Sequence, residues 1–541
     1  MAETKREIER KYEATAETRL PDLTRAAGVA AVTGEGVTVL DAVYYDTADL
    51  RLAADSLTLR RRTGGRDEGW HLKFPVAVGV RDEIRAPLSD ELPPSLAALL
   101  RSRVRHAELL PVVHLHSSRD VRHLRDTNGT ILAELSIDTV HAERLLGGRD
   151  EGAAGAAAGT GGGAAAGTAG RTAAGTAAGA VAPTASRTAA WTEIEVELAD
   201  GADPGVLDVV EKRLRKAGIR ASDAPSKLAR ALDETGLAPG GVAEAGGEGS
   251  AGAAVFAYVR EQVEALVRLD PAVRRDLPDA VHQMRVACRR LRSAFKTYRR
   301  VLDREVTDPV GAELKWLAGE LGHARDQEVL DARLRAALDD LPREERRGPV
   351  RRRLRAWDRA RARAARRRGL DALDSARHLA LLDALAGLLA DPPLRPGARK
   401  KAAKALPKAV LRDHARLAGR IAPALALAPG HERDLALHEA RKAAKRARYA
   451  ADAAVPTLGK PAKRLAKRVK AVQSLLGDHQ DAVVARTALR DLAADAEKAG
   501  EPSFTWGVLH AKQEASAETR EHELPEVWER AVTEHAAGRL I

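Results

Sequence analysis

The sequence predicts an α+β multi-domain protein with an N-terminal antiparallel β-barrel and a C-terminal all-α region. Two observations predict this division. Residues 1–140 contain short segments in which charged and apolar residues alternate, which is the period of a β-strand. From residue 253 onward the chain is rich in Ala, Leu and Arg, which are strong helix formers. A chain of 541 residues is long enough for two or more domains.

Six segments of the N-terminal half place charged residues on one side of a strand. In EIERKYE (7–13), Glu7, Glu9 and Lys11 share a face, because strand side chains alternate with a period of two. The pattern recurs in LTLRRR (57–62), WHLKF (70–74), RDEIR (81–85), AELSID (133–138) and TEIEVEL (192–198). A solvated face is the ordinary explanation for any single strand of this kind. These faces, however, carry full charges of both signs and little Ser, Thr or Gln.

A closed barrel explains all six strands together. Its apolar faces would pack outward against helices, and its charged faces would line a lumen. Carboxylates bind hard cations such as Mg²⁺ or Mn²⁺, and arginine binds phosphate oxygens through two parallel hydrogen bonds. The charged faces therefore favour a lumen that holds a metal-bound polyphosphate.

The remaining N-terminal segments complete the first domain, residues 1–235. A short helix is expected near 21–27, and longer helices near 203–217 and 225–235. The Gly/Ala/Thr-rich stretch at about 150–190 has no periodic apolar face, so we expect a disordered insert. A second Gly-rich stretch, 236–252, is expected to be the linker to the helical domain at 253–541.

Proline is expected to mark the joints between the helices of the second domain. The positions are Pro271, Pro278, Pro309, Pro342, Pro392, Pro393, Pro423, Pro456 and Pro502. Only 3% of the chain is aromatic and 44% is hydrophobic, so its cores must consist mainly of Ala, Leu and Val. The single cysteine, Cys288, excludes an intramolecular disulfide and a cysteine-rich metal site. With no apolar run of membrane-spanning length and no signal-like start, we expect a cytoplasmic protein without a membrane partner.

The helical half contains an internal repeat. VHQMRVACRRLRSAF (281–295) aligns with LHEARKAAKRARYAA (437–451), and LGHARDQEVL (321–330) aligns with LGDHQDAVVA (476–485). The offset between the aligned segments is about 155 residues in both cases, which predicts two tandem helical bundles. Each copy places one histidine and three basic residues on one helix face. These stripes are His282, Arg285, Arg289 and Arg292, and His438, Arg441, Lys445 and Arg448.

The helical half also carries most of the positive charge. It holds about 58 Lys and Arg against about 40 Asp and Glu, whereas the rest of the chain holds about 31 against about 37. A basic domain attracts polyanions. Nucleic acid is the less favoured partner, because the basic region has few aromatic residues for base stacking and no recognition-helix or zinc-finger signature. A solvated helix face remains the alternative for each stripe.

The N-terminal motifs resemble the CYTH family of triphosphate tunnel metalloenzymes. EIERK near the start, YYDT (44–47), LRRR, WHLKFP, EIEVE and SK (226–227) occur in that order over residues 3–235. The resemblance implies an eight-stranded antiparallel tunnel that binds triphosphate with a divalent metal. Family activities include inorganic triphosphatase, thiamine triphosphatase, RNA triphosphatase and adenylate cyclase.

The resemblance also implies roles for individual residues. The catalytic residues it implies are Glu7, Glu9, Lys11 and Lys73. The expected metal ligands are Glu7, Glu9, Asp138, Glu193 and Glu195. The expected contacts to triphosphate are Lys11, Arg60, Arg62, Lys73, Arg119 and Lys227, with Glu83 and Arg85 as further charged candidates. No expected charge is missing, so the resemblance favours an active site over a degenerate one.

The helical half resembles the CHAD domain, which is often fused to CYTH. The resemblance rests on the two histidine-containing stripes and on the paired LGHARDQEV and LGDHQDAVV segments. It implies two four-helix bundles with a basic surface that binds inorganic polyphosphate. Together the two domains lead us to expect a metal-dependent hydrolase of inorganic triphosphate or polyphosphate. A polyphosphate-binding protein without activity and an adenylate cyclase acting on ATP remain as alternatives.

Overall fold

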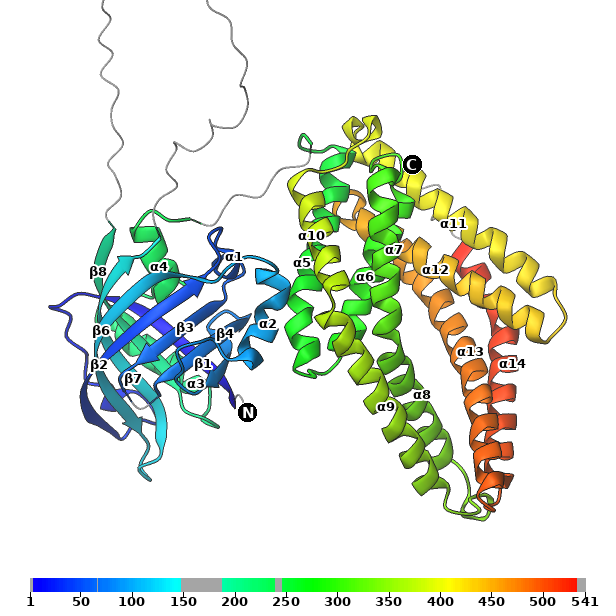
Figure 1. The fold of residues 1–541 in the computed structure, drawn as a ribbon, viewed down its shortest axis with the longest axis horizontal. Coiled ribbons are helices and arrows are strands. Elements are labelled where there is room, and N and C mark those ends of the chain that lie inside the picture. Colours follow the sequence, from blue (N-terminus) through cyan, green and yellow to red (C-terminus); the bar gives the residue numbers. More distant parts are fainter. Residues whose placement is uncertain (1–2, 66, 147–186, 239–245, 533–541) are drawn as a thin grey trace, which may run out of the picture. The chain divides into compact units, whose positions relative to one another are not determined.

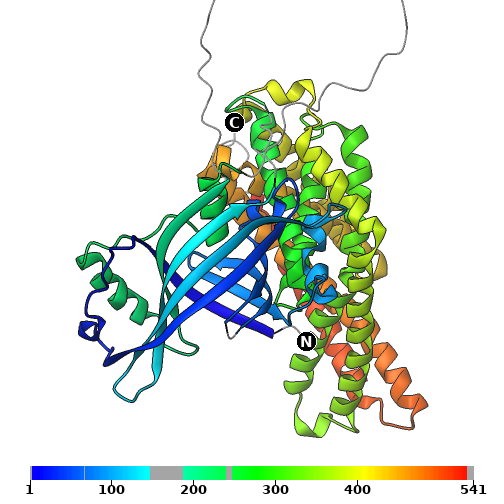
Figure 2. The same ribbon diagram turned by 60° about the vertical axis from the view of Figure 1, so that its left-hand side comes forward.

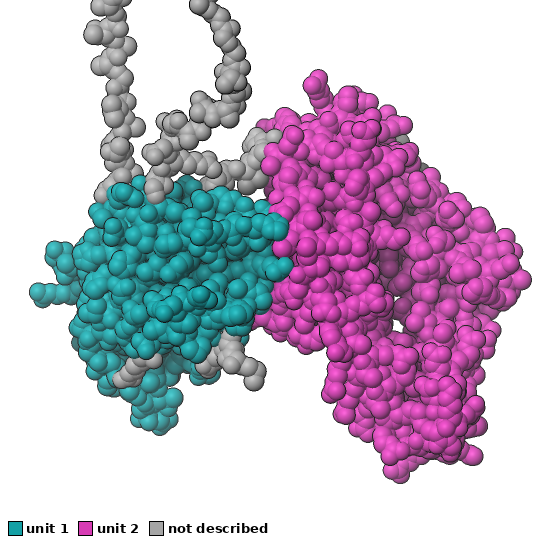
Figure 3. Space-filling view, viewed as in Figure 1, with its two compact units in different colours: residues 1–241 teal, residues 242–541 magenta. Residues whose placement is uncertain are grey.

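The computed structural model describes residues 3–65, 67–146, 187–238 and 246–532. The chain divides into two compact units, residues 1–241 and 242–541 (Figure 3). Most of the insert expected at 150–190 lies outside the described residues. Its end does not, because strand β8 begins at Thr188 and pairs there with Glu143. Part of the expected linker also lies outside them, and helix α5 begins within it at Ala251, where the Ser250 side chain caps the helix.

The first unit is a closed antiparallel barrel of eight strands (Figures 1 and 2). The strands are β1 (Glu3–Ala14), β2 (Ala31–Asp46), β3 (Thr58–Thr63), β4 (Gly69–Ala77), β5 (Val80–Ala86), β6 (Leu110–Arg125), β7 (Ile131–Arg144) and β8 (Thr188–Leu198). Their order around the barrel is β1-β5-β4-β3-β2-β6-β7-β8, and β1 closes it by pairing with both β5 and β8. The predicted closed barrel is therefore confirmed.

The apolar faces of the strands point outward, as the sequence predicts. Leu72 and Ile84 pack with Leu96 of α2 (Pro94–Val104), near the short helix α1 (Arg51–Ala54). Ile194 packs with Val210 of α3 (Gly205–Lys216). The short helix expected near 21–27 is a single 3₁₀ turn, η1 (Leu23–Arg25). Burying the apolar faces outside the barrel leaves the charged faces for the lumen.

Helix α4 (Lys227–Glu234) carries a lysine into this lumen. The Ser226 side chain caps the helix by accepting a hydrogen bond from the Ala229 backbone N–H at 3.1 Å. Leu228 and Leu232 pack against Trp191 and other apolar residues of the barrel. These contacts fix α4 against the barrel, and Lys227, its first residue, lines the lumen.

The second unit is helical. Its helices are α5 (Ala251–Arg274), α6 (Ala280–Thr297), α7 (Arg304–Glu320), α8 (Gly322–Asp339), α9 (Val350–Asp374), α10 (Ala376–Ala390), α11 (Ala402–Ala426), α12 (His431–Leu458), α13 (Lys460–Lys498) and α14 (Phe504–Val532), with 3₁₀ turns η2 (Arg343–Glu345) and η3 (Pro396–Arg399). The aligned segments occupy corresponding elements: α6 and α12 carry the two stripes, and α13 spans as one helix what α7 and α8 span as two. None of the described helices is long and apolar enough to cross a membrane.

Both apolar cores of this unit draw on both copies of the repeat. One core combines residues of α5, α6 and α7 with residues of α11, α12 and α13. The other joins Leu334 of α8 and Leu354 of α9 to Ala485 of α13 and Trp506 of α14. Figure 1 shows the α8–α9 and α13–α14 pairs extending in the same direction, with their loops close together. The two copies therefore stabilise each other.

Four prolines were wrongly expected to end helices. Pro271, Pro309, Pro423 and Pro456 lie inside α5, α7, α11 and α12. An interior proline removes a backbone hydrogen bond and costs about 3 kcal/mol. These helices bury long apolar faces, and tertiary packing of this kind overrides local propensity. The other five prolines lie between helices, as expected.

Candidate functional site

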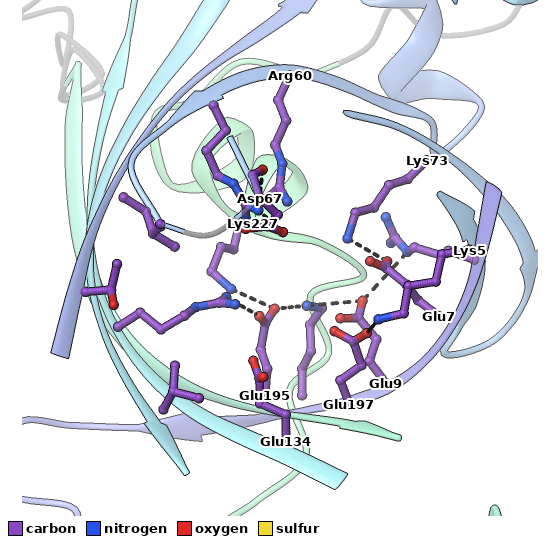
Figure 4. Close-up of a pocket in the computed structure, with 18 of the residues that line it drawn as sticks. Lys5, Glu7, Glu9, Arg60, Asp67, Lys73, Glu134, Glu195, Glu197 and Lys227 are labelled. Carbon is purple, nitrogen blue, oxygen red and sulfur yellow. Dashed lines mark hydrogen bonds and ion pairs between the residues drawn. The ribbon is translucent and has the colours of Figure 1, made fainter. Parts of the chain in front are cut away.

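The charged faces enclose a cavity of about 430 Å³ inside the barrel (Figure 4). Most residues that the sequence assigns to the tunnel line this cavity: Glu7, Glu9, Lys11, Arg60, Arg62, Lys73, Arg85, Arg119, Glu195 and Lys227. Three further assigned carboxylates, Glu83, Asp138 and Glu193, are buried in its wall. The barrel strands and helix α4 therefore bring together residues that lie more than 200 positions apart.

Strand β1 contributes two carboxylates, Glu7 and Glu9, and two ammonium groups, Lys5 and Lys11. Glu7 accepts a hydrogen bond from Lys73 Nζ at 2.6 Å. Glu9 lies 3.3 Å from Lys11 Nζ and 3.9 Å from the Arg81 guanidinium. Lys11 also donates to Glu195 of the neighbouring strand β8. The charged face of β1 is thus joined to both of its neighbours, one on each side.

The two β1 carboxylates have different environments. Burial raises the pKa of Glu7, and Lys73 only partly opposes that effect while Glu83 and Glu197 add to it. Burial would also raise the pKa of Glu9, but Lys11, Lys73 and Arg81 together bring it below its usual value. Glu9 is therefore held as a carboxylate near neutral pH, and Glu7 is the more readily protonated of the two.

Glu83 organises cations at the wall of the tunnel. Its carboxylate accepts from His71 Nδ1 at 2.8 Å and from Arg85, and Lys73 Nζ lies 3.5 Å away. Burial opposes ionisation, but Lys73, His71 and Arg60 lower the pKa of Glu83 well below its usual value. The side chain is fully buried. Glu83 thus positions neighbouring bases, whereas Arg85 itself reaches the cavity.

Three carboxylates converge on the opposite wall. One oxygen from each of Asp138, Glu193 and Glu195 lies within 4.8 Å of the others. Lys227 Nζ contacts all three, at 2.9 Å from Asp138, 2.6 Å from Glu193 and 2.7 Å from Glu195. Arg119 binds both oxygens of Asp138 at 2.7 Å and Glu195 at 2.8 Å. We call Asp138, Glu193 and Glu195 the acidic trio.

The acidic trio fits a hard divalent cation. It offers three carboxylate oxygens within ligand distance of one another, which is the donor type that Mg²⁺ and Mn²⁺ prefer. Glu7 and Glu9 lie on β1, apart from this group, and are engaged by Lys73, Lys11 and Arg81. Of the five expected metal ligands, three converge on one point within the described residues.

Arginines form a further part of the lining. Arg60 donates to the Tyr44 hydroxyl at 3.3 Å, and Arg62 forms an ion pair with Asp67. Burial, followed by repulsion from Arg60, lowers the pKa of Arg62 to about 10. Burial would raise the pKa of Tyr44, but Arg60, Lys227 and Lys73 bring it below its usual value. The lowered pKa values of Arg62 and Tyr44 agree with the several positive charges that line this part of the cavity.

Several lining residues were not assigned from the sequence. Arg81 and Glu197 lie on the charged strand faces that alternation predicts, although no role was assigned to them. Lys5 shares the face of Glu7, so the same alternation could have found it. Tyr44 lies within the quoted YYDT motif but carried no role. Asp67 lies outside the strands, beyond Gly64 and Gly65, which both have positive φ, and no periodic signal marks it. Glu134 lies on the charged face of AELSID, where only Asp138 was assigned.

The two basic stripes lie on α6 and α12, which pack against each other. Arg285 donates to Asp326 at 2.9 Å, and its counterpart Arg441 lies 3.7 Å from Asp481. Burial and the charges of Arg441, Arg289 and Arg285 lower the pKa of Lys445 to about 7. The central members of the two stripes therefore form one shared basic cluster.

The outer members of the stripes differ between the copies. His438 Nδ1 lies 2.6 Å from Gln480 Oε1. The pKa of His282 is lowered by burial and by Arg325, while Asp279 opposes the shift. Arg448 lies 3.4 Å from Asp452 and donates to Gln473 at 3.1 Å. The two stripes lie on corresponding helices, α6 and α12, but the neighbours of their residues are not the same.

Comparison with known proteins agrees with both halves of the fold. The CYTH domain model matches residues 5–232, and the CHAD domain model matches residues 257–490. The uncharacterized proteins MT2285 and Rv2226 of Mycobacterium tuberculosis are each 38% identical over 519 residues, covering 95% of this chain and 93% of theirs.

The solved structures that align with this chain cover about half of it. PptA from Streptomyces chartreusis is 23% identical with a TM-score of 0.43, covering 52% of this chain and 100% of its own. The putative adenylyl cyclase HpAC1 from Hippeastrum, described as having a dominant triphosphatase activity, is 17% identical with a TM-score of 0.22, covering 43% and 97%. The two family matches and the curated relatives show that the chain belongs to the CYTH and CHAD families, with one domain of each.

Proposed function

We propose that this protein is a metal-dependent inorganic triphosphatase or polyphosphatase whose helical domain binds inorganic polyphosphate. The observation that carries the proposal is the lumen itself. Within about 430 Å³ it gathers Lys11, Lys73, Arg60, Arg62 and Arg119 beside carboxylates of β1 and the acidic trio. A chain of phosphoryl groups has the charge and the narrow shape that such a tunnel accepts.

The chain's own residues would bind and orient the substrate. Arg60, Arg62 and Lys73 would hold phosphoryl oxygens on one side of the tunnel, with Lys11 and Arg119 on the other. The acidic trio, with Glu7 and Glu9, would hold Mg²⁺ or Mn²⁺, which supplies charge neutralisation at the phosphoryl oxygens. A water would attack the terminal phosphorus, and the bridging P–O bond would break to release orthophosphate and the chain shortened by one phosphate. Glu9, held ionised by its three cationic neighbours, is a suitable acceptor for a hydrogen bond from that water.

The helical domain would supply affinity for long chains. The shared basic cluster contains Arg285, Arg289, Arg441 and Lys445, whose mutual repulsion contributes to the low pKa of Lys445. A polyanion would relieve that repulsion. His282 and His438 lie on the same helix faces as these bases and, when protonated, would donate hydrogen bonds to phosphate oxygens.

The test is orthophosphate release from tripolyphosphate with Mg²⁺ or Mn²⁺, comparing wild type with Glu9→Ala. Glu13→Ala is the matched control, because Glu13 lies on the same strand but is exposed and paired with Arg230. We expect metal-dependent release that Glu9→Ala abolishes and Glu13→Ala retains. Absence of release with long polyphosphate still bound would identify a binding protein instead. Conversion of ATP to cyclic AMP and pyrophosphate would identify a cyclase.

A further inference from the structure

A second cavity lies in the helical unit, between α6, α7, α11 and α12. Its volume is about 410 Å³. Besides Arg304, which is ion-paired with Asp308 at 2.6 Å, six bases line it: Arg292, Lys296, Arg299, Lys315, Arg416 and Arg446. We call it the α6–α7 basic cavity. Only Arg292 belongs to the stripes that the sequence singles out.

Most of this positive charge is not neutralised by the protein. Asp413 is almost fully buried and engages Arg446 at 3.0 Å, Arg416 at 3.7 Å and the Thr297 hydroxyl at 2.5 Å. Within the described ranges, no acid lies within ion-pair distance of Arg292, Lys296, Arg299 or Lys315. Like charges held this close repel one another, which costs stability unless an anion joins them.

The internal repeat supplies a comparison for this site. With the offset of the aligned helices, Arg292 corresponds to Arg448, Lys296 to Asp452 and Arg299 to Val455. Arg448 is neutralised by Asp452 at 3.4 Å and bonded to Gln473. Two bases in the first copy thus correspond to one acid and one apolar residue in the second. The shared fold does not require the positive charge, since the second copy folds without it.

The lining also indicates the kind of anion. Besides these bases, the cavity is lined by Asp308, which pairs with Arg304, and by Thr307, Gly311, Ala312 and Phe295. Phe295 is fully buried in the core and offers no face for base stacking. Burial, followed by Arg292 and Arg446, lowers the pKa of Lys296, which agrees with the geometric evidence for unbalanced positive charge. A compact anion with several charged oxygens matches a cavity of this size lined from several helices.

We propose that the α6–α7 basic cavity binds a compact phosphate anion of pyrophosphate or triphosphate size, and that the corresponding position in the second copy does not. The inference rests on the proposed function only for the choice of phosphates, since the tunnel would consume and release anions of this class. It adds a site that is separate from the tunnel and present in one copy of the repeat.

The test is isothermal titration of the full chain with pyrophosphate in moderate salt, using Lys296→Gln/Arg299→Gln. Both residues are exposed, so the double variant should fold, and its thermal unfolding curve checks this. We expect one binding site fewer than in wild type, or affinity at that site about tenfold weaker. Arg359→Gln/Arg363→Gln removes two exposed bases of α9 outside the cavity and should leave pyrophosphate binding unchanged.

The outcomes separate this proposal from the tunnel activity. Identical pyrophosphate binding in wild type and the double variant would overturn it. The proposal would also be overturned if the double variant bound pyrophosphate as wild type does but bound long polyphosphate more weakly. The cavity would then be part of an extended surface that binds polyphosphate chains. Loss of the site in a protein that releases no orthophosphate from tripolyphosphate would support the cavity and contradict the triphosphatase.

Discussion

Lys227 Nζ lies 2.6 Å from Glu193 Oε1, and the same ammonium contacts the other two carboxylates of the acidic trio. One side chain therefore stands where the trio's oxygens converge. The lysine is almost fully buried, and although burial opposes its charge, the three carboxylates raise its pKa well above the usual value. Arg119 and Lys11 supply two more positive charges, so the trio is balanced by three internal cations.

This balance predicts competition between Lys227 and a divalent metal. In Lys227→Met the trio loses its central cation, so we expect tighter binding of Mn²⁺ in the absence of phosphate. We also expect lower stability without metal, by about 3 kcal/mol, because buried carboxylates lose a partner. Metal should therefore raise the melting temperature of the variant more than that of wild type.

Titration of Mn²⁺, followed by the magnetic resonance signal of the free ion, measures the affinity directly. Lys212→Met is the control, because Lys212 is an exposed lysine on α3 outside the tunnel. Equal Mn²⁺ affinities in wild type and Lys227→Met would show that the ammonium and the metal do not share the trio.

Trp191 donates a hydrogen bond to Glu193, a member of the acidic trio. Its indole Nε1 donates to Glu193 Oε2 at 2.7 Å, both side chains are buried, and the Arg230 guanidinium lies 5.0 Å from the ring centroid. Trp191→Phe keeps a packed ring but leaves a buried carboxylate oxygen without its donor. We expect a loss of about 1–3 kcal/mol in the free energy of unfolding and a weaker affinity for Mn²⁺.

The matched control is Trp70→Phe. Trp70 Nε1 donates at 3.0 Å to the Ser89 carbonyl on the outer side of the barrel, so this change should reduce stability without altering Mn²⁺ affinity. If both variants lower Mn²⁺ affinity to the same degree, Trp191 acts only through the general stability of the barrel.

Strand alternation predicted much of the barrel but not all of it. The segments around Glu7, Lys73 and Glu193 have clear charged and apolar faces, and all are strands with those faces directed as expected. Strands β2 and β6 were not singled out, because both mix polar with apolar residues, and much of β2 is also exposed. Helix α2 was missed as well, although Leu96, Leu99 and Leu100 form its buried side.

The residues of the site could be predicted where they lie on alternating strand faces. The contacts between them could not, because those depend on how separate elements pack together. Alternation and resemblance gave the residues of the acidic trio, but not that Lys227 contacts all of them, because that requires the docking of α4. Asp67 lies outside the strands and forms an ion pair with Arg62, and a contact of this kind cannot be predicted from strand or helix periodicity. Likewise, the repeat aligned Arg292 with Arg448 but could not show that only Arg448 is neutralised.

Arg119 is expected to be irreplaceable by lysine. Its Nε and Nη2 atoms bind both oxygens of Asp138 at 2.7 Å, and Nη2 also reaches Glu195. An ammonium cannot reproduce this two-point contact. Arg119→Lys should therefore lower kcat/KM for tripolyphosphate about tenfold or more. Arg122→Lys is the control on the same strand, since Arg122 pairs with Asp120 and does not line the tunnel. Equal effects of the two changes would contradict a specific role for Arg119.

Lys445 gives polyphosphate binding a pH dependence near neutrality. Burial, followed by Arg441, Arg289 and Arg285, lowers its pKa to about 7, and Asp481 opposes the shift. A bound polyanion stabilises the ammonium, so binding takes up a proton whenever the free protein has lost it. Affinity should therefore fall as pH rises from about 6 to about 8, by up to about tenfold per pH unit above the free pKa.

The histidines of the stripes contribute less in this range. The pKa of His282 and that of His438 are both lowered, chiefly by burial, so both carry less positive charge near neutral pH than an unperturbed histidine. Calorimetry in buffers of different ionisation enthalpy measures the proton uptake. Lys445→Arg should flatten the pH dependence, because arginine stays charged, whereas Lys442→Arg, at an exposed neighbouring position, should leave it as in wild type. A profile that is unchanged in Lys445→Arg would assign the pH dependence to another group.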